Sequence, residues 1–115
     1  MGRTVFQDSY SVAANEPGYD ILQNKRFRIL DRHAFLTLYA TGSALGVQLE
    51  MYVGKNNVME KSAISAANRI PQTYDMLVNE IEGLANQQMQ LVASNTTASA
   101  VTVFWRIDID DNVTM

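Results

Sequence analysis

Two stretches of this chain alternate between apolar and polar residues with a period of two, which is typical of a strand with one buried face. In residues 45–53 (LGVQLEMYV) the apolar positions are Leu45, Val47, Leu49, Met51 and Val53. In residues 101–109 (VTVFWRIDI) they are Val101, Val103, Trp105, Ile107 and Ile109. The pattern predicts two half-buried strands whose apolar faces, including Met51 and Trp105, form part of the core.

Weaker alternation predicts six further strands. These are residues 4–12, 27–30, 34–40, 57–64, 74–81 and 89–94. Turn-forming segments rich in Gly, Pro, Asn and Ser separate them, at residues 16–18, 41–43, 54–57, 83–88 and 95–99. About eight short strands at this spacing predict an all-β fold, namely a single antiparallel β-sandwich of the jelly-roll type.

Residues 58–82 leave a second interpretation open. Residues that favour helices are common here, and Ile64, Ala67 and Ile70 stand at partial helical spacing. Pro71 would end a helix that began before it. We expect a long connection with room for a short helical turn, followed by a strand at about 76–82.

Length and composition narrow the class of protein. A chain of 115 residues fits one domain over residues 1–115 with a single core. Hydrophobic residues make up 47% of the chain and charged residues only 18%, which indicates a globular protein with a lightly charged surface of the kind that partners cover. The net charge of −3 argues against general nucleic-acid binding, because that binding needs a basic face.

The sequence has neither an apolar window long enough for a membrane helix nor the features of a signal peptide at its start. We therefore expect a protein without a membrane span that is made in the cytoplasm. The absence of cysteine excludes a disulfide framework, a thiolate zinc site and a thiol nucleophile.

Closely spaced carboxylates mark the end of the last predicted strand. Asp108, Asp110 and Asn112 match the first three ligand positions of a helix-loop-helix calcium loop. The sixth position of such a loop needs glycine, and here it is Val113. We therefore prefer a charged strand end that discourages edge-to-edge pairing of sheets, and keep a loose surface calcium site as the alternative.

Patterns typical of an active site are missing. His33 is the only histidine, and the segment GSALG at 42–46 is not the Gly-x-Ser-x-Gly turn of serine hydrolases. Four glutamates that could pair as in glycosidases stand where a solvated strand face or turn would place a charge anyway: Glu50, Glu60, Glu80 and Glu82. We predict a protein that is not an enzyme and that has no catalytic residue, no cofactor and no committed metal ligand.

The candidate interface residues are aromatic and basic. Phe104 alternates with Trp105, and Tyr52 with Met51, so both rings point outward if the alternate set fills the core. Arg106 shares the face of Phe104. Either another part of the chain covers these rings, or they belong to a subunit or protein interface, where aromatic residues and arginine concentrate.

A basic run, KRFRILDR at 25–32, adds Arg26 and Arg28 to the candidate interface. Its mixture of cations and aromatics resembles single-strand nucleic-acid surfaces. We prefer a strand with both arginines on its outer face and with Phe27 and Ile29 in the core. If the run has a partner, an acidic protein surface fits it best.

The order of these segments resembles the small jelly-roll structural proteins of viruses, in particular the decoration or cement proteins of tailed-bacteriophage heads. The segments that carry the resemblance are YDIL, LTLYATGS, VQLEMYVGKNN, NRIPQTYD and QMQLVASNTTASAVTVFW. The resemblance covers most of the chain, and it is one of strand rhythm and loop character.

The resemblance implies a homotrimer on the outer surface of the capsid, bound to the major capsid protein at three-fold or quasi-three-fold positions, which stabilises the shell. The protein would then be part of the virion. The alternative on the same fold is a carbohydrate-binding or receptor-binding module of a head fibre or tail tip, with a glycan stacked on Tyr52, Phe104 or Tyr74.

Overall fold

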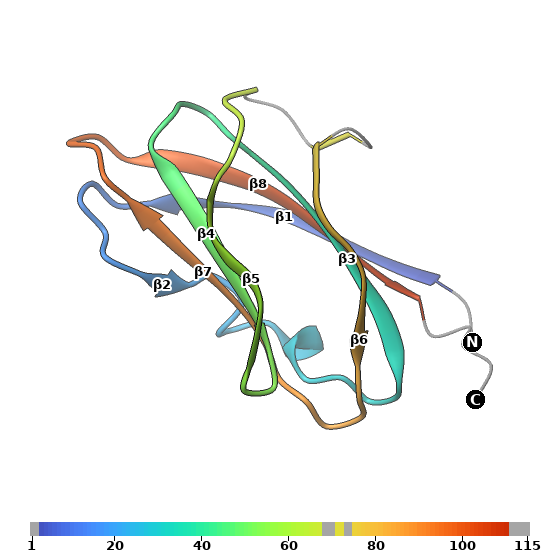
Figure 1. The fold of residues 1–115 in the computed structure, drawn as a ribbon. Helices are drawn as coiled ribbons and strands as arrows, with labels where there is room; N and C mark the ends of the chain where they lie inside the picture. Colours follow the sequence, from blue (N-terminus) through green and yellow to red (C-terminus); the bar gives the residue numbers. More distant parts are fainter. Residues whose placement is uncertain (1–2, 68–70, 73–74, 111–115) are drawn as a thin grey trace.

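The computed structural model describes residues 3–67, 71–72 and 75–110, which form eight strands and one short 3₁₀ helix (Figure 1). The elements in chain order are β1 (Arg3–Val12), β2 (Tyr19–Asp20), η1 (Arg26–Arg28), β3 (Ala34–Gly42), β4 (Val47–Val53), β5 (Asn56–Ala63), β6 (Met76–Gly83), β7 (Met89–Asn95) and β8 (Val101–Asp110).

The strands form two four-stranded sheets that face each other (Figure 1). The first sheet has the order β1-β8-β3-β6, and the second has the order β2-β7-β4-β5. The antiparallel pairs are nested along the chain, because β4 pairs with β5, β3 with β6, β2 with β7 and β1 with β8. This nesting places successive strands in alternate sheets, except for the β4–β5 hairpin within the second sheet, and the predicted jelly-roll sandwich is confirmed.

The core lies between the two sheets and is built by alternation. Every second residue of β4, from Val47 to Val53, is buried, and the residues between them are only half-buried. The largest buried side chain from the other sheet is that of Trp105, which is 1% exposed. Other large side chains that are fully buried are Leu22, Leu36, Leu38, Leu49, Met51, Met89, Leu91 and Ile107.

The predicted strand at residues 27–30 is wrong, because Arg26–Arg28 forms the 3₁₀ helix η1 and Ile29 makes only an isolated antiparallel bridge with Gln88. This segment belongs to the connection that carries the chain from β2 in the second sheet to β3 in the first. Leu22 and Leu30 anchor it in the core, at 0% and 4% exposure, and local backbone hydrogen bonds lead into and through the helix between them. The Lys25 amide donates to the Leu22 carbonyl at 2.9 Å. The eighth strand is instead the two-residue β2, which is too short for alternation to reveal.

The helical interpretation of residues 58–82 is wrong for most of the residues that the structure describes there. Asn56–Ala63 forms β5 and Met76–Gly83 forms β6, so the strand expected at about 76–82 is confirmed. The start of the connection between them is tied to the end of β3, because the Gly42 amide donates to the Ser65 carbonyl at 2.8 Å.

Leu45 does not belong to the core, contrary to the prediction from alternation. It is 71% exposed, because β4 begins only at Val47. Between them Gly46 has a φ of +116°, and a Cβ at this position would collide with the side chain of Thr97. Glycine is therefore required at the turn, and the strand cannot extend back to Leu45.

No helix in the described ranges has the length and apolarity needed to cross a bilayer.

Replacing Trp105 by alanine tests the core. Because this ring is 1% exposed between the sheets, Trp105→Ala should lower the free energy of unfolding by about 4 kcal/mol, measured by urea denaturation. The matched control is Leu45→Ala, whose side chain is 71% exposed and whose loss should cost less than about 0.5 kcal/mol. Similar costs for the two variants would contradict the assignment of the core.

Candidate functional site

The candidate site lies on the outer face of the first sheet, over its two central strands. We call it the β8–β3 face. It consists of Phe104, Arg106, Asp108 and Asp110 from β8 and of Phe35, Thr37, Tyr39 and Thr41 from β3. The register between the strands places Arg106 beside Tyr39, and Asp108 beside Thr37.

An ion pair runs along the middle of this face. The Arg106 guanidinium donates two hydrogen bonds to Asp108, from Nε to Oδ1 at 2.7 Å and from Nη2 to Oδ2 at 3.1 Å. The Asp108 side chain is only 3% exposed and that of Arg106 is 29% exposed. Hydrogen bonding to the carboxylate raises the pKa of Arg106 further above its ordinary value. A forked, bidentate pair of this kind fixes the guanidinium in one orientation.

The prediction that the aspartates form a charged strand end, which discourages edge-to-edge pairing of sheets, is wrong for Asp108. Asp108 is on the outer face, as the alternation predicts, but β8 is a central strand between β1 and β3. The residue is also 2% exposed, so it acts as a buried ion-pair partner and does not protect a sheet edge. Asn112, the third residue of the calcium pattern, lies outside the described residues.

Arg106 also covers Tyr39. The guanidinium carbon lies 5.0 Å from the centre of the ring, which is the geometry of a cation–π contact. Tyr39 is consequently 7% exposed, although it points away from the core. Its hydroxyl makes no hydrogen bond to any residue in the described ranges.

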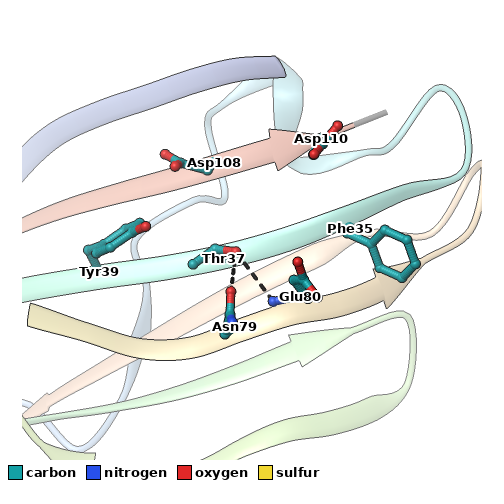
Figure 2. Close-up of a pocket in the computed structure, with 7 residues that line it drawn as sticks. All are labelled: Phe35, Thr37, Tyr39, Asn79, Glu80, Asp108 and Asp110. Atoms are coloured by element: carbon teal, nitrogen blue, oxygen red, sulfur yellow. Dashed lines mark hydrogen bonds between the residues drawn. The ribbon is translucent and has the colours of Figure 1, made fainter. Parts of the chain in front are cut away.

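A small polar pocket opens beside Tyr39 between β3, β6 and β8 (Figure 2). Its volume is about 140 Å³, and its lining residues are Phe35, Thr37, Tyr39, Asn79, Glu80, Asp108 and Asp110. The Tyr39 hydroxyl is turned toward the space between Asp108 and Thr37 (Figure 2). The pocket therefore combines a buried hydroxyl with carboxylates, an amide and two aromatic rings.

A bulge in β6 forms one wall of the pocket. Leu36 pairs with Ile81 and Leu38 with Val78, so two residues of β6, Asn79 and Glu80, oppose the single Thr37 of β3. The Thr37 hydroxyl donates to Asn79 Oδ1 at 3.2 Å and accepts the Glu80 amide at 3.3 Å.

Glu80 in this bulge has a φ of +50°, a left-handed conformation that costs a non-glycine residue about 1 kcal/mol. The strain is local to the pocket wall. Residues strained in this way cluster at functional sites, where the surrounding structure holds them in place. Here the bulge places the Asn79 amide and the Glu80 carboxylate at the pocket.

The other candidate interface residues lie elsewhere. Tyr52 is on β4, on the outer face of the second sheet, where it is half-buried and donates a hydrogen bond to Glu50 Oε2 at 3.2 Å. Arg26 and Arg28 are on η1 and not on a strand face, so that part of the prediction is wrong. Arg28 is half-buried, and its Nη1 donates to the Lys25 carbonyl at 3.0 Å.

Of the predicted interface residues, the structure thus places only Phe104 and Arg106 on one face. The alternation that buries Leu36, Leu38 and Ala40 already places Tyr39 and Thr37 on the opposite face of their strand. The bulge that brings Asn79 and Glu80 to them carries no comparable signal, so sequence reasoning missed the pocket. Among the described residues, no group of three or more histidine, aspartate or glutamate side chains is arranged as metal ligands are.

Replacing Arg106 by leucine tests the ion pair. The change removes the guanidinium from a carboxylate that is 3% exposed, and it should lower the free energy of unfolding by about 3 kcal/mol in urea denaturation. The double variant Arg106→Leu, Asp108→Val removes both charges and should be more stable than Arg106→Leu alone.

The matched control for this variant is Arg32→Leu. The Arg32 side chain is 56% exposed and its Nε lies 3.6 Å from Asp31 Oδ1, so its loss should cost less than about 1 kcal/mol. Equal costs at Arg32 and Arg106 would show that the buried pair does not stabilise the face.

Comparison with known proteins adds no relative: no family model, no curated protein and no solved structure matches the chain. The function is therefore argued from the geometry of this chain.

Proposed function

We propose that this protein is a non-enzymatic structural protein of a virion, which binds the outer surface of a capsid as a homotrimer and stabilises the shell. The observation that carries the proposal is the sheet order, β1-β8-β3-β6 over β2-β7-β4-β5. Eight-stranded jelly rolls of this kind occur in viral capsid proteins and in lectin domains. The order of the strands and the character of the loops in the sequence also resemble those of the decoration proteins of bacteriophage heads.

The interior of the sandwich supports a structural role. The large fully buried side chains between the sheets are apolar, with Trp105, Met51 and Leu38 among them. A ligand or partner of the described chain therefore meets an outer face, an edge or a loop. A rigid oligomer with several such surfaces gains affinity for a shell by contacting several capsid subunits at once, without one tight contact.

The β8–β3 face is the surface that we assign to the subunit or capsid contact. Phe104 and Arg106 are both half-buried there, and residues of these two types are enriched at interface cores. Asp108 holds the Arg106 guanidinium in place, so little side-chain entropy is lost when a partner covers it. Closed self-association through such a face would cover the Phe104 ring.

Purified protein should therefore have a native mass that is a multiple of three chains at micromolar concentration by light scattering, and it should bind expanded empty capsids of the virus that encodes it, measured by co-sedimentation. Phe104→Glu places a charge in the proposed contact and should abolish the trimer, the capsid binding or both. A monomeric wild-type protein that does not bind these capsids would overturn the proposal.

The matched control is Leu45→Glu, which adds the same charge at a side chain that is 71% exposed and lies outside the β8–β3 face. This variant should keep the native mass and the capsid binding. Thermal unfolding of both variants, followed by circular dichroism, separates loss of contact from loss of fold.

The pocket favours a second candidate function, glycan binding. It has one half-buried ring on which a sugar can stack, that of Phe35, beside the Tyr39 hydroxyl and the amide and carboxylate groups that bind sugar hydroxyls. The pocket is small, and its volume of about 140 Å³ suits one polar group or ring of a ligand. Tyr52 and Phe104 do not line it, and Tyr74 lies outside the described residues.

A glycan array separates the two candidates. If the protein only stabilises a capsid, we expect no glycan to bind. A hit that weakens at least tenfold in Tyr39→Phe, which removes only the hydroxyl that faces the pocket, would instead establish the glycan function. The same hit with unchanged affinity in Tyr39→Phe would place the glycan elsewhere on the protein.

A further inference from the structure

The two sheets of the sandwich have four edge strands, β1, β6, β2 and β5, and three of them are poor templates for another strand. Strand β2 has two residues. Strand β5 has register shifts against β4, and β6 carries the bulge at Asn79 and Glu80. Short, bulged and twisted edges are the usual protection against pairing with another chain.

Strand β1 has none of these protections. It runs for ten residues, from Arg3 to Val12, and pairs with β8 without a single register shift. Among the strands that the structure describes, its only neighbour in the first sheet is β8. The sequence from Thr4 to Val12 contains no proline and no glycine. The edge is thus long, regular and continuous.

The hydrogen-bond pattern identifies the backbone groups that point to this edge. The Ser43 amide donates to the Thr102 carbonyl at 2.8 Å, so the polar groups of Thr102 are directed toward β3. Direction alternates along an antiparallel strand, so those of Val103 and Trp105 are directed toward β1. Their partners on β1 are the even-numbered residues. The amides and carbonyls directed away from the sheet are those of Val5, Gln7, Ser9 and Ser11.

Ser9 provides an independent check on this assignment. Its amide donates to the Asp8 side chain, at 2.8 Å to Oδ1, rather than to β8. Lys25 Nζ lies 2.7 Å from the other oxygen of the same carboxylate. These hydrogen bonds, led by the one from Lys25, lower the pKa of Asp8. One outward amide is therefore covered by the chain's own side chain.

The side chains of β1 also suit a protein partner. Val5 is 44% exposed and Tyr10 is 36% exposed, two unusually exposed apolar residues on one strand. Tyr10 is held in place by stacking on Tyr19, with ring centres 5.1 Å apart. Asp8 is the one ionisable carboxylate between Thr4 and Val12, and Lys25 pairs with it. Little charge on this edge would repel a second strand.

We infer that β1 is an interface for a second copy of this chain, which pairs with it antiparallel, β1 against β1, across a two-fold axis. Such a pair is self-complementary, because the outward amides of Val5, Gln7 and Ser11 in each copy meet outward carbonyls of the other, while the Ser9 amide stays with Asp8. A register centred on Gln7 places Asp8 opposite Phe6 of the second copy, so the two carboxylates do not face each other. The two first sheets then form one continuous eight-stranded sheet.

We assign the partner strand to β1 of a second copy, because the two-fold pair satisfies the exposed edges of both chains at once. The inference goes beyond the proposed function and does not depend on a capsid. It is also compatible with a trimer, because a three-fold contact through the β8–β3 face uses a different surface from the β1 edge. If the protein is a trimer, pairing of its three β1 edges with those of a second trimer would give a hexamer.

The experiment compares Gln7→Pro with Gln7→Thr. Proline removes the outward amide of Gln7 and leaves the hydrogen bonds to β8, a position at which edge strands tolerate proline. Threonine keeps the amide and is the matched control. The native mass of the wild type, by light scattering at micromolar concentration, should be an even multiple of the chain mass. Gln7→Pro should halve it, and Gln7→Thr should leave it unchanged.

A second variant keeps the test decisive if the proline disturbs the fold. Val5→Lys adds a charge to the same edge at a side chain that is 44% exposed, and it should also halve the native mass. Amide hydrogen exchange gives a separate reading, because the Gln7 amide should exchange slowly in the wild type and at least tenfold faster in Val5→Lys.

A wild-type assembly with an odd number of copies, such as a monomer or a lone trimer, would overturn the inference. An even-numbered assembly that neither edge variant divides would overturn it as well. Capsid binding is measured separately. A wild-type protein that forms an even-numbered assembly but does not bind capsids would count against the proposed function and would leave the β1 contact unaffected.

Discussion

The alternation of side chains along β8 is the constraint on which most of this structure depends. This strand pairs along its length with β1 on one side and over eight residues with β3 on the other, so its register fixes the first sheet. One set of its side chains, with Trp105 at the centre, fills the core. The other set holds the Arg106–Asp108 ion pair. A slip of one residue would exchange the two sets and bury the charges between the sheets.

Burying Asp108 has a cost that its hydrogen bonds to Arg106 offset. Desolvating a carboxylate is unfavourable unless a partner satisfies it, and here the guanidinium does so with two hydrogen bonds. The same guanidinium covers the ring of Tyr39. The Tyr39 hydroxyl is then left at the wall of a pocket whose shape depends on the strained bulge at Glu80. Charge pairing, ring cover and backbone strain are thus concentrated in one small part of the surface.

Much of the fold could be predicted from the sequence, because a half-buried strand repeats its pattern every two residues. That signal identified β4 and β8, and in weaker form β1, β3, β5, β6 and β7. It failed at β2, which is too short to repeat, and at 27–30, where the alternation of apolar and basic residues begins in the 3₁₀ helix Arg26–Arg28.

The candidate site was harder to predict for a related reason. Alternation indicates which face a residue lies on, but it does not reveal which strands are neighbours. Asp108 was assigned to the correct face and to the wrong environment, because the sequence does not show that β8 is a central strand. The bulge at Asn79 and Glu80 depends on pairing with Thr37, more than forty positions away. An interaction of that range has no signature within either segment.

The nesting of the strand pairs has a consequence for how the molecule is made. In β1 and β8, Arg3 lies beside Asp110 and Val12 beside Val101, so the earliest strand finds its partner only when the latest strand has been synthesised. Pairing across such a sequence distance carries a large loop-closure entropy and is slow. On the ribosome, the hairpin of β4 and β5 can form long before β8 has been synthesised, whereas β1 remains unpaired on both of its edges until then. A cell that makes this protein quickly therefore holds, for a time, many chains with an unpaired β1, and this is the interval in which they are most prone to associate incorrectly.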